Sequence, residues 1–193
     1  MELNFDYKDL KSIHGYLFEE VYSFAGQDRF EMGIFDDFGK RNPATGEISW
    51  FVSGIDIPVE AKKLFVEIRE KDYFRNMQLF EFVKEISNFF GKLNTLHPFR
   101  EGNGRTQRIF TELLAEKAGY KLDLETNIDK QTMIDACNYS MSGDNRKMFV
   151  IFFKSCKPTN QPPKKTELKD KTIFFVENED AATDENIYKK RFR

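Results

Sequence analysis

One short stretch, LHPFREGNGRTQR, gathers residue types that can bind and transfer a phosphate group. It runs from Leu96 to Arg108 and holds one histidine, one acid, two glycines and three arginines. Glycine permits unusual backbone angles and lets a ligand approach the backbone closely. Successive backbone N–H groups in such a turn can bind an anion, and the N-terminus of a following helix adds a positive dipole. The stretch therefore predicts a polyphosphate site between two helices.

Four side chains in the stretch have a chemical use at such a site. Arg105 and Arg108 are three residues apart, so they share one helix face and are expected to point along the anion site. Glu101 would repel phosphates unless a bound Mg²⁺ bridges the carboxylate and phosphate oxygens. A neutral imidazole at His97 can accept the proton of an attacking hydroxyl group. A plain helix–loop–helix turn with surface arginines is the alternative, but the joint pattern favours phosphoryl or nucleotidyl transfer.

Mostly helical elements are expected to position this stretch. Apolar residues at steps of three and four predict a helix over about Tyr7–Phe24, with His14 near its apolar stripe as a structural residue. Residues 29–55 break the helical period and predict an irregular loop with a β-hairpin, whose second strand is about Ile48–Ser53. The same spacing rules predict further helices at about Pro58–Lys71, Leu79–Leu96, Gly104–Gly119, Lys130–Met141 and Asp144–Cys156.

The composition indicates a soluble globular domain with an appendage. The chain has 193 residues, of which 40% are hydrophobic and 32% charged, and its net charge of −2 gives no reason to expect nucleic-acid binding. Cys137 and Cys156 lack metal or disulfide spacing, which fits a reducing compartment. No signal peptide or membrane span is evident. The composition becomes polar and lysine-rich at Lys157, which predicts a domain over 1–156 and a linker and tail over 157–193.

The stretch matches H-x-F-x-[DE]-G-N-G-R-x-x-R at every fixed position and so resembles the Fic family. IHGYLFEEVYSFAGQDR resembles the N-terminal helix of that family, and GDNRKMF resembles the start of its closing helix. Together these segments cover roughly residues 10–156. The resemblance implies an all-α Fic fold, with a β-hairpin "flap" at about 29–55 and an active-site loop at 97–108. It also implies transfer of AMP from ATP to a Ser, Thr or Tyr hydroxyl of a target protein.

The resemblance further implies a role for each matching residue. His97 resembles the catalytic base, Glu101 the Mg²⁺ ligand, and Phe99 the residue that anchors the loop in the core. The phosphate-transferring Doc branch has a lysine at the place of Gly104, so the glycine favours nucleotidyl transfer. The residues that match the ATP-binding and phosphate-binding positions are Gly102, Asn103, Gly104, Arg105 and Arg108.

Two surfaces of the chain are less clearly specified. The hairpin residues Trp50, Phe51 and Val52 are predicted to dock the target as an added strand, the alternative being a covering loop. The adenine pocket is expected at the Met133–Gly143 helix end. Two other readings of the whole chain stay open: a Fic-fold transferase of another phosphate-containing group, and a catalytically silent nucleotide-binding interaction module. The presence of His97 argues against the second, because a pure binder needs no base.

The control of activity is also left open by the sequence. Many members of the family carry an inhibitory helix with [ST]-x-x-x-E-[GN], whose glutamate pairs with the second motif arginine. IFFVEN supplies Glu177, but Ile173 stands where Ser or Thr is expected, so a segment over about 172–178 is a degenerate candidate. Otherwise a separate antitoxin protein is the expected restraint. The resemblance is consistent with a bacterial toxin or effector that acts in the cytoplasm or is secreted into a host cell, and a homo-oligomer stays open.

Overall fold

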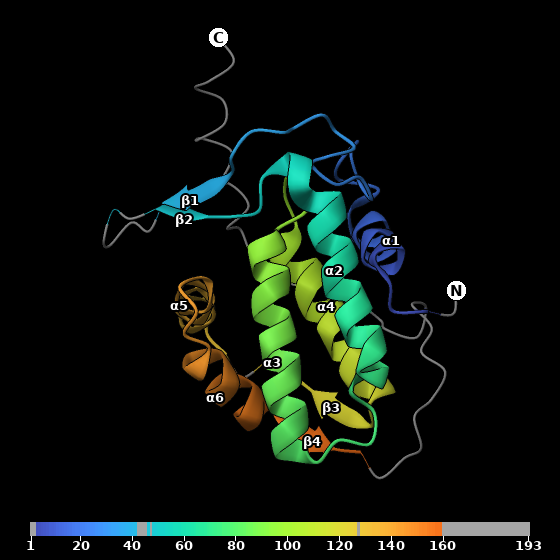
Figure 1. The fold of residues 1–193 in the computed structure, drawn as a ribbon, viewed down its shortest axis with the longest axis vertical. Helices are drawn as coiled ribbons and strands as arrows, with labels where there is room; N and C mark the ends of the chain where they lie inside the picture. Colours follow the sequence, from blue (N-terminus) through green and yellow to red (C-terminus); the bar gives the residue numbers. More distant parts are fainter. Residues whose placement is uncertain (1–2, 42–45, 47, 127, 160–193) are drawn as a thin grey trace.

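The computed structural model describes residues 3–41, 46, 48–126 and 128–159 as a mostly helical bundle with a projecting β-hairpin (Figure 1). This arrangement confirms the expected all-α class with a hairpin. In chain order the elements are α1 Tyr7–Phe18, β1 Gly39–Arg41, β2 Ile48–Trp50, α2 Ile57–Glu70, α3 Leu79–Leu96, α4 Asn103–Lys117, β3 Tyr120–Leu122, α5 Lys130–Met141, α6 Arg146–Ser155 and β4 Cys156–Pro158, with 3-10 turns at Gly54–Asp56 and Asp72–Phe74.

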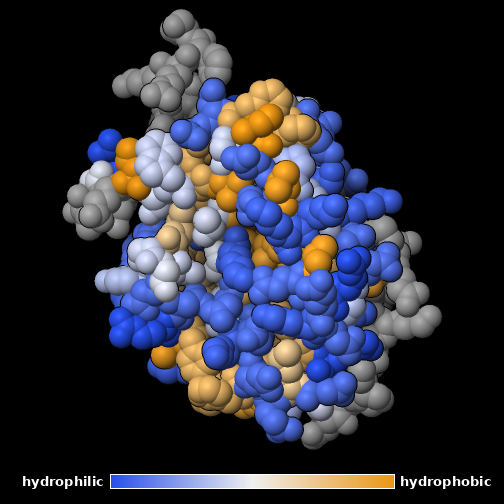
Figure 2. All heavy atoms as spheres, in the orientation of Figure 1, coloured by the Kyte–Doolittle hydropathy of each residue, from blue (hydrophilic) through white to orange (hydrophobic). Residues whose placement is uncertain are grey.

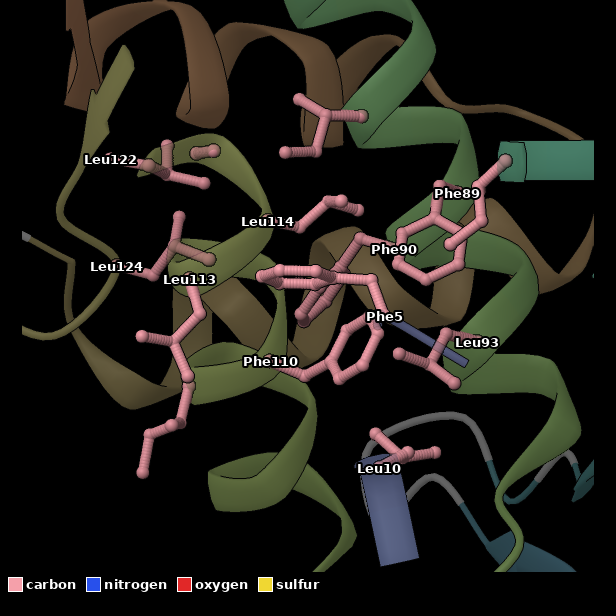
Figure 3. Close-up of a cluster of buried hydrophobic side chains, with 14 of the residues drawn as sticks. Phe5, Leu10, Phe89, Phe90, Leu93, Phe110, Leu113, Leu114, Leu122 and Leu124 are labelled. Carbon is pink, nitrogen blue, oxygen red and sulfur yellow. The ribbon is translucent and has the colours of Figure 1, made fainter. Parts of the chain in front are cut away.

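The core extends through the whole bundle, and aromatic and leucine side chains of α3 and α4 pack together in the part that Figure 3 shows. Phe89, Phe90 and Leu93 of α3 are buried, and so are Phe110 and Leu114 of α4. Burying each such side chain stabilises the fold by about 1.5–3 kcal/mol. The abundance of phenylalanine is therefore largely a packing feature. This packing fixes the two helices whose connection is the stretch 97–102.

The first helix is shorter than its apolar spacing predicts. A capping box between Asp6 and Asp9 starts α1, and the helix ends at Phe18 instead of Phe24. The predicted end was wrong because the chain turns back after Phe18. The backbone N–H of Gly26 donates to His14 Nδ1 at 2.9 Å, and Gly26 has a φ of +82°. This tertiary contact overrides the periodic pattern.

The hairpin pairs β1 with β2 in antiparallel register, Gly39 opposite Trp50. β2 stops at Trp50, before the predicted end at Ser53, because the chain then bonds to other parts of the fold. Val52 N donates to Thr95 O of α3 at 2.9 Å, and Ser53 Oγ donates to Phe35 O at 2.9 Å. The base of the hairpin is thus attached to the C-terminal end of α3.

A second small sheet, β3 with β4, was not predicted. Lys157 and Pro158 lie in β4, where Tyr120 is opposite Pro158, and Thr159 N donates to Gly119 O at 2.9 Å. The three-residue strands are too short for a clear period, and their pairing is non-local, so no local pattern indicates them. The ordered pairing continues past the change in composition at Lys157. Segment 172–178 with Glu177 lies outside the described residues.

The hairpin and the α3–α4 connection lie at one end of the bundle, and β3–β4 lies at the other (Figure 1). Figure 2 shows hydrophilic residues over most of the face formed by α2 and α3. The exposed large hydrophobic residues described within 29–55 are Phe30, Phe35, Ile48, Trp50 and Ile55, and others, such as Phe80 and Phe153, are exposed elsewhere. No helix of the described part is long and apolar enough to cross a membrane.

Candidate functional site

His97 terminates α3 and faces the hairpin. It has the left-handed conformation, with a φ of +42°, and its backbone N–H makes the last helical bond, to Leu93 O. Pro98 disfavours helical geometry at the preceding residue, which explains why the helix ends at Leu96 as predicted. The imidazole stacks on the ring of Phe51 at 3.8 Å between centroids, with 17° between planes. The hairpin therefore fixes the plane of this imidazole ring.

Arg29 joins the hairpin to the end of α3, a role that the sequence analysis missed. Its side chain is fully buried. Nε donates to His97 O at 3.0 Å, and Nη2 donates to Val52 O at 2.6 Å and to Leu96 O at 3.5 Å. A cation at a helix C-terminus also complements the helix dipole. A single arginine in an irregular segment carries no spacing signal, so only the fold shows this role.

The turn after His97 requires glycine at position 102. Gly102 has a φ of +79°, and a Cβ built there would lie 2.4 Å from Phe18 Cε2. Thr106 Oγ1 donates to Gly102 O at 3.0 Å and fixes the peptide on the far side of the glycine. The first backbone N–H groups of a helix have no partner within that helix, so the start of α4 is suited to bind an anion. Anion binding at this turn stays a prediction.

Asn103 and Phe99 hold the loop together from inside. Asn103 is buried, its Oδ1 accepts from Phe99 N at 2.9 Å, and its Nδ2 donates to Phe99 O at 2.6 Å. Phe99 is fully buried and stacks on His14 at 3.9 Å between centroids. The side chain of Asn103 therefore supports the loop from inside, and its backbone N–H lies at the start of α4. The buried Gln107, to which the sequence analysis gave no role, donates to Leu93 O at 3.1 Å and links α4 to α3.

The two motif arginines do not converge in this structure, although both were expected to point along the anion site. The guanidinium carbon of Arg105 lies 4.5 Å from the centroid of the Phe18 ring. Arg108 Nε lies 3.6 Å from Glu125 Oε1, which sits in the connection between β3 and α5. A Cβ on Gly104 would lie 3.3 Å from Arg108 Nη1, so this terminal nitrogen is close to the anion-binding turn.

Glu101 is partly buried, and its backbone is held by α1. His14 Nε2 lies 3.0 Å from Glu101 O, and burial lowers the pKa of His14. His14 is fully buried, which confirms its predicted structural character.

Among the described residues there is no group of three or more His, Cys, Asp or Glu that could hold a metal. Mg²⁺ is commonly bound by one or two carboxylates together with substrate phosphates, so a single Glu101 carboxylate fits this mode of binding.

The hairpin presents two kinds of side chain. Phe51 and Val52 contact His97 and α3, whereas Trp50 is 59% exposed and Ile48 is 39% exposed. A Cβ on Gly39 would lie 2.8 Å from atoms of both Ile48 and Trp50, so these two side chains cover the same glycine. The three predicted docking residues are thus divided: one faces solvent and two bind the hairpin to the site.

Two surface hollows of about 410 and 760 Å³ lie along α3. Both are partly lined by the turn after α5, where Gly143 and Asn145 lie, and neither lining includes a residue of 97–108. Neither hollow is therefore part of the candidate site, which consists of the loop 97–108 and the hairpin. The adenine pocket at Met133–Gly143 stays a prediction.

Comparisons with known proteins agree with this geometry. The family model for the Fic/DOC family matches residues 4–115. The probable protein adenylyltransferase y4lH of Sinorhizobium fredii is 36% identical over 140 residues, which cover 72% of this chain and 67% of that protein. The protein adenylyltransferase VbhT of Bartonella schoenbuchensis is 35% identical over 147 residues, which cover 76% of this chain but only 28% of VbhT.

Solved structures give the same result. The effector BepC of Bartonella tribocorum, crystallised with AMPPNP, has a TM-score of 0.71 and 30% identity, over 81% of this chain and 76% of its own. The N-terminal Fic domain of a Bartonella quintana effector with bound ADP has a TM-score of 0.72 and 31% identity, over 81% of this chain and 75% of its own. The loop, the hairpin and these matches lead to one conclusion: the chain belongs to the Fic/DOC family.

Proposed function

We propose that this chain is a protein adenylyltransferase that transfers AMP from ATP to a Ser, Thr or Tyr hydroxyl of a target protein, with His97 as the general base. The hydroxyl oxygen attacks the α-phosphorus of ATP, and His97 accepts the hydroxyl proton. The bond between the α-phosphorus and the oxygen that bridges to the β-phosphate breaks, and pyrophosphate leaves. This activity is the one named for the relatives that match most of the described chain.

One observation carries the proposal. The fold brings the imidazole of His97 and the turn at Gly102 to the same end of α3 and α4, under the hairpin residue Phe51. A base beside an anion-binding turn is the minimum that hydroxyl attack on a phosphate requires. A helix–loop–helix turn with only a structural purpose does not need an imidazole stacked beneath a hairpin.

The same geometry supports a proposal for where the nucleotide and the metal bind. Nucleotides are present in the related structures, which supports ATP as co-substrate. The backbone N–H groups at Gly102–Gly104 and the guanidinium groups of Arg105 and Arg108 would hold the phosphates. Glu101 would hold Mg²⁺, which supplies positive charge to phosphate oxygens when it is bound. Arg108 Nη1 lies near Gly104 already, so Arg108 needs little movement to reach a phosphate.

The target is proposed to dock on the hairpin. Ile48 and Trp50 form an exposed apolar pair on β2, beside a site whose nucleophile must come from another protein. Among the described residues β2 pairs with β1 alone, so an extended target segment can add to the other edge of β2. Phe51 and Val52 would keep this edge in register with His97. Trp50 is thus the docking residue that most directly meets the target.

The biological setting is proposed from relatives. Several matched Bartonella proteins of known structure, BepC among them, are VirB-translocated effectors, and relatives named as probable protein adenylyltransferases come from other bacteria. We therefore place the chain as a bacterial toxin or effector that acts in a cytoplasm, with a separate antitoxin protein or the segment around Glu177 as its restraint. Homo-oligomer formation is compatible with this proposal.

Mass spectrometry of a lysate incubated with the chain, ATP and Mg²⁺ tests the proposed function. AMP adducts on Ser, Thr or Tyr are expected with the wild type and not with His97→Ala. Adducts of another phosphate-containing group would support transfer of that group instead. Tight ATP binding with no adduct at all would support the silent binding module.

A further inference from the structure

His14 of α1 makes two hydrogen bonds, one with the backbone of Gly26 and one with the backbone of Glu101 in the functional loop. The backbone N–H of Gly26 points to Nδ1 at 2.9 Å, and the backbone O of Glu101 lies 3.0 Å from Nε2. A backbone N–H only donates and a carbonyl only accepts. Nδ1 must therefore be the unprotonated acceptor, and the proton must be on Nε2, from which it is donated to Glu101 O. The neighbours of the ring thus determine its tautomer.

The bond to Glu101 O also orients the next N–H group. The described chain contains no cis peptide, and in a trans peptide the C=O and the following N–H point in opposite directions. Because Glu101 C=O points at the buried His14, the N–H of Gly102 points away from α1. We propose that His14 is a positioning residue that fixes the Glu101–Gly102 peptide, so that the Gly102 N–H faces the phosphates of the nucleotide. This inference rests on the proposed function.

The surroundings of His14 leave the ring little freedom. Phe99 stacks on it with 12° between planes, and the side chain is fully buried. Gly26 is held against α1, since a Cβ on Gly15 would lie 3.6 Å from Gly26 Cα. On the other side of Gly102, Thr106 Oγ1 binds the carbonyl of Gly102. Both peptides that flank this glycine are thus fixed, the first by His14 and the second by Thr106.

A purely space-filling role explains these contacts less well. Burying a polar ring is unfavourable unless its nitrogens are hydrogen-bonded, and an apolar side chain would fill the space without that cost. The hydrogen bond to Glu101 O joins residues 87 positions apart in the chain. This hydrogen bond therefore joins α1 to the residue immediately before the turn at Gly102.

Two matched variants separate the two hydrogen bonds. The terminal amide of Gln has the same reach as Nε2, so His14→Gln keeps a donor for Glu101 O and loses the acceptor for Gly26. The amide of Asn has the reach of Nδ1, so His14→Asn keeps the acceptor for Gly26 and loses the donor for Glu101 O. Both variants lose the stacking on Phe99. Comparing their melting temperatures shows whether the fold is affected equally.

The readout is the affinity for ADP, measured by calorimetry with Mg²⁺ and again in EDTA. His14→Asn is expected to weaken ADP binding about tenfold in both conditions, the size of one hydrogen bond to a charged group. His14→Gln is expected to stay within about threefold of the wild type, a loss of less than one hydrogen bond. Equal ADP affinities for the two variants would overturn the positioning role. Because ADP binding and not AMP transfer is measured, failure of this inference can be told apart from failure of the proposed transfer reaction.

A measurement on the wild type covers variants that fail to fold. Nitrogen chemical shifts of labelled histidine should show His14 protonated on Nε2 and not on Nδ1, with an Nε2–H resonance that moves when ADP binds. The opposite tautomer, or an Nε2–H resonance that ADP leaves unchanged, would contradict the inference.

Discussion

Replacing Gly102 by alanine tests the requirement for glycine at the turn. The φ of +79° at this residue is left-handed, and the added Cβ would lie 2.4 Å from Cε2 and 2.7 Å from Cζ of Phe18. A left-handed conformation costs a non-glycine residue about 1–2 kcal/mol. Forcing an extra methyl group into a packed core costs about 1–3 kcal/mol more. We therefore expect Gly102→Ala to lower the free energy of unfolding by about 2–5 kcal/mol.

Urea denaturation with linear extrapolation measures this loss. Gly104→Ala is the matched control, because the structure gives Gly104 no positive φ and its added Cβ meets only the mobile end of Arg108 at 3.3 Å. The control should keep or slightly raise the free energy of unfolding, since alanine favours a helix over glycine by up to about 1 kcal/mol. If Gly102→Ala were as stable as Gly104→Ala, the described turn would be wrong.

Three further predictions concern the metal, the buried arginine and the hairpin. Glu101→Gln should abolish the increase in ADP affinity that Mg²⁺ gives while leaving the affinity in EDTA unchanged; an undiminished Mg²⁺ effect by calorimetry would exclude Glu101 as ligand. Arg29→Met should lower the free energy of unfolding by about 2–4 kcal/mol, because the carbonyls of His97 and Val52 lose a charged donor; a urea midpoint equal to that of the wild type would refute this. Trp50→Ala should change stability by less than about 0.5 kcal/mol and leave ADP affinity intact while reducing AMP transfer to the target; unchanged target labelling would remove Trp50 from docking.

The loop from His97 to Arg108 was largely predictable because its signals are local. Pro98 acts on its neighbour to end α3, and Gly102 adopts a backbone angle that few other residues accept. The type of each residue therefore indicates its geometry directly. The position of α5 was predicted within the same bounds, and the Asp129 side chain, which accepts a hydrogen bond from Thr132 N, caps its first turn.

The features that were missed depend on contacts between distant residues. The end of α1 at Phe18 depends on Gly26 binding His14, and the apolar residue Val21, which extended the pattern, is 65% exposed. Arg29 and Gln107 are functional supports whose partners are backbone carbonyls, which leave no mark in the sequence. The contacts that support the site could therefore be identified only from the fold, whereas the residues proposed to carry its chemistry could be identified from the sequence.

Incubation with ATP radiolabelled at either the α-phosphate or the γ-phosphate tests the central claim most directly. Target protein, Mg²⁺ and the wild-type chain should give label on the protein from α-labelled ATP only. His97→Ala should give no label from either, while its ADP affinity stays near that of the wild type, because the imidazole acts on the proton of the nucleophile. Stable γ-label on a protein hydroxyl, or undiminished α-labelling by His97→Ala, would contradict the account.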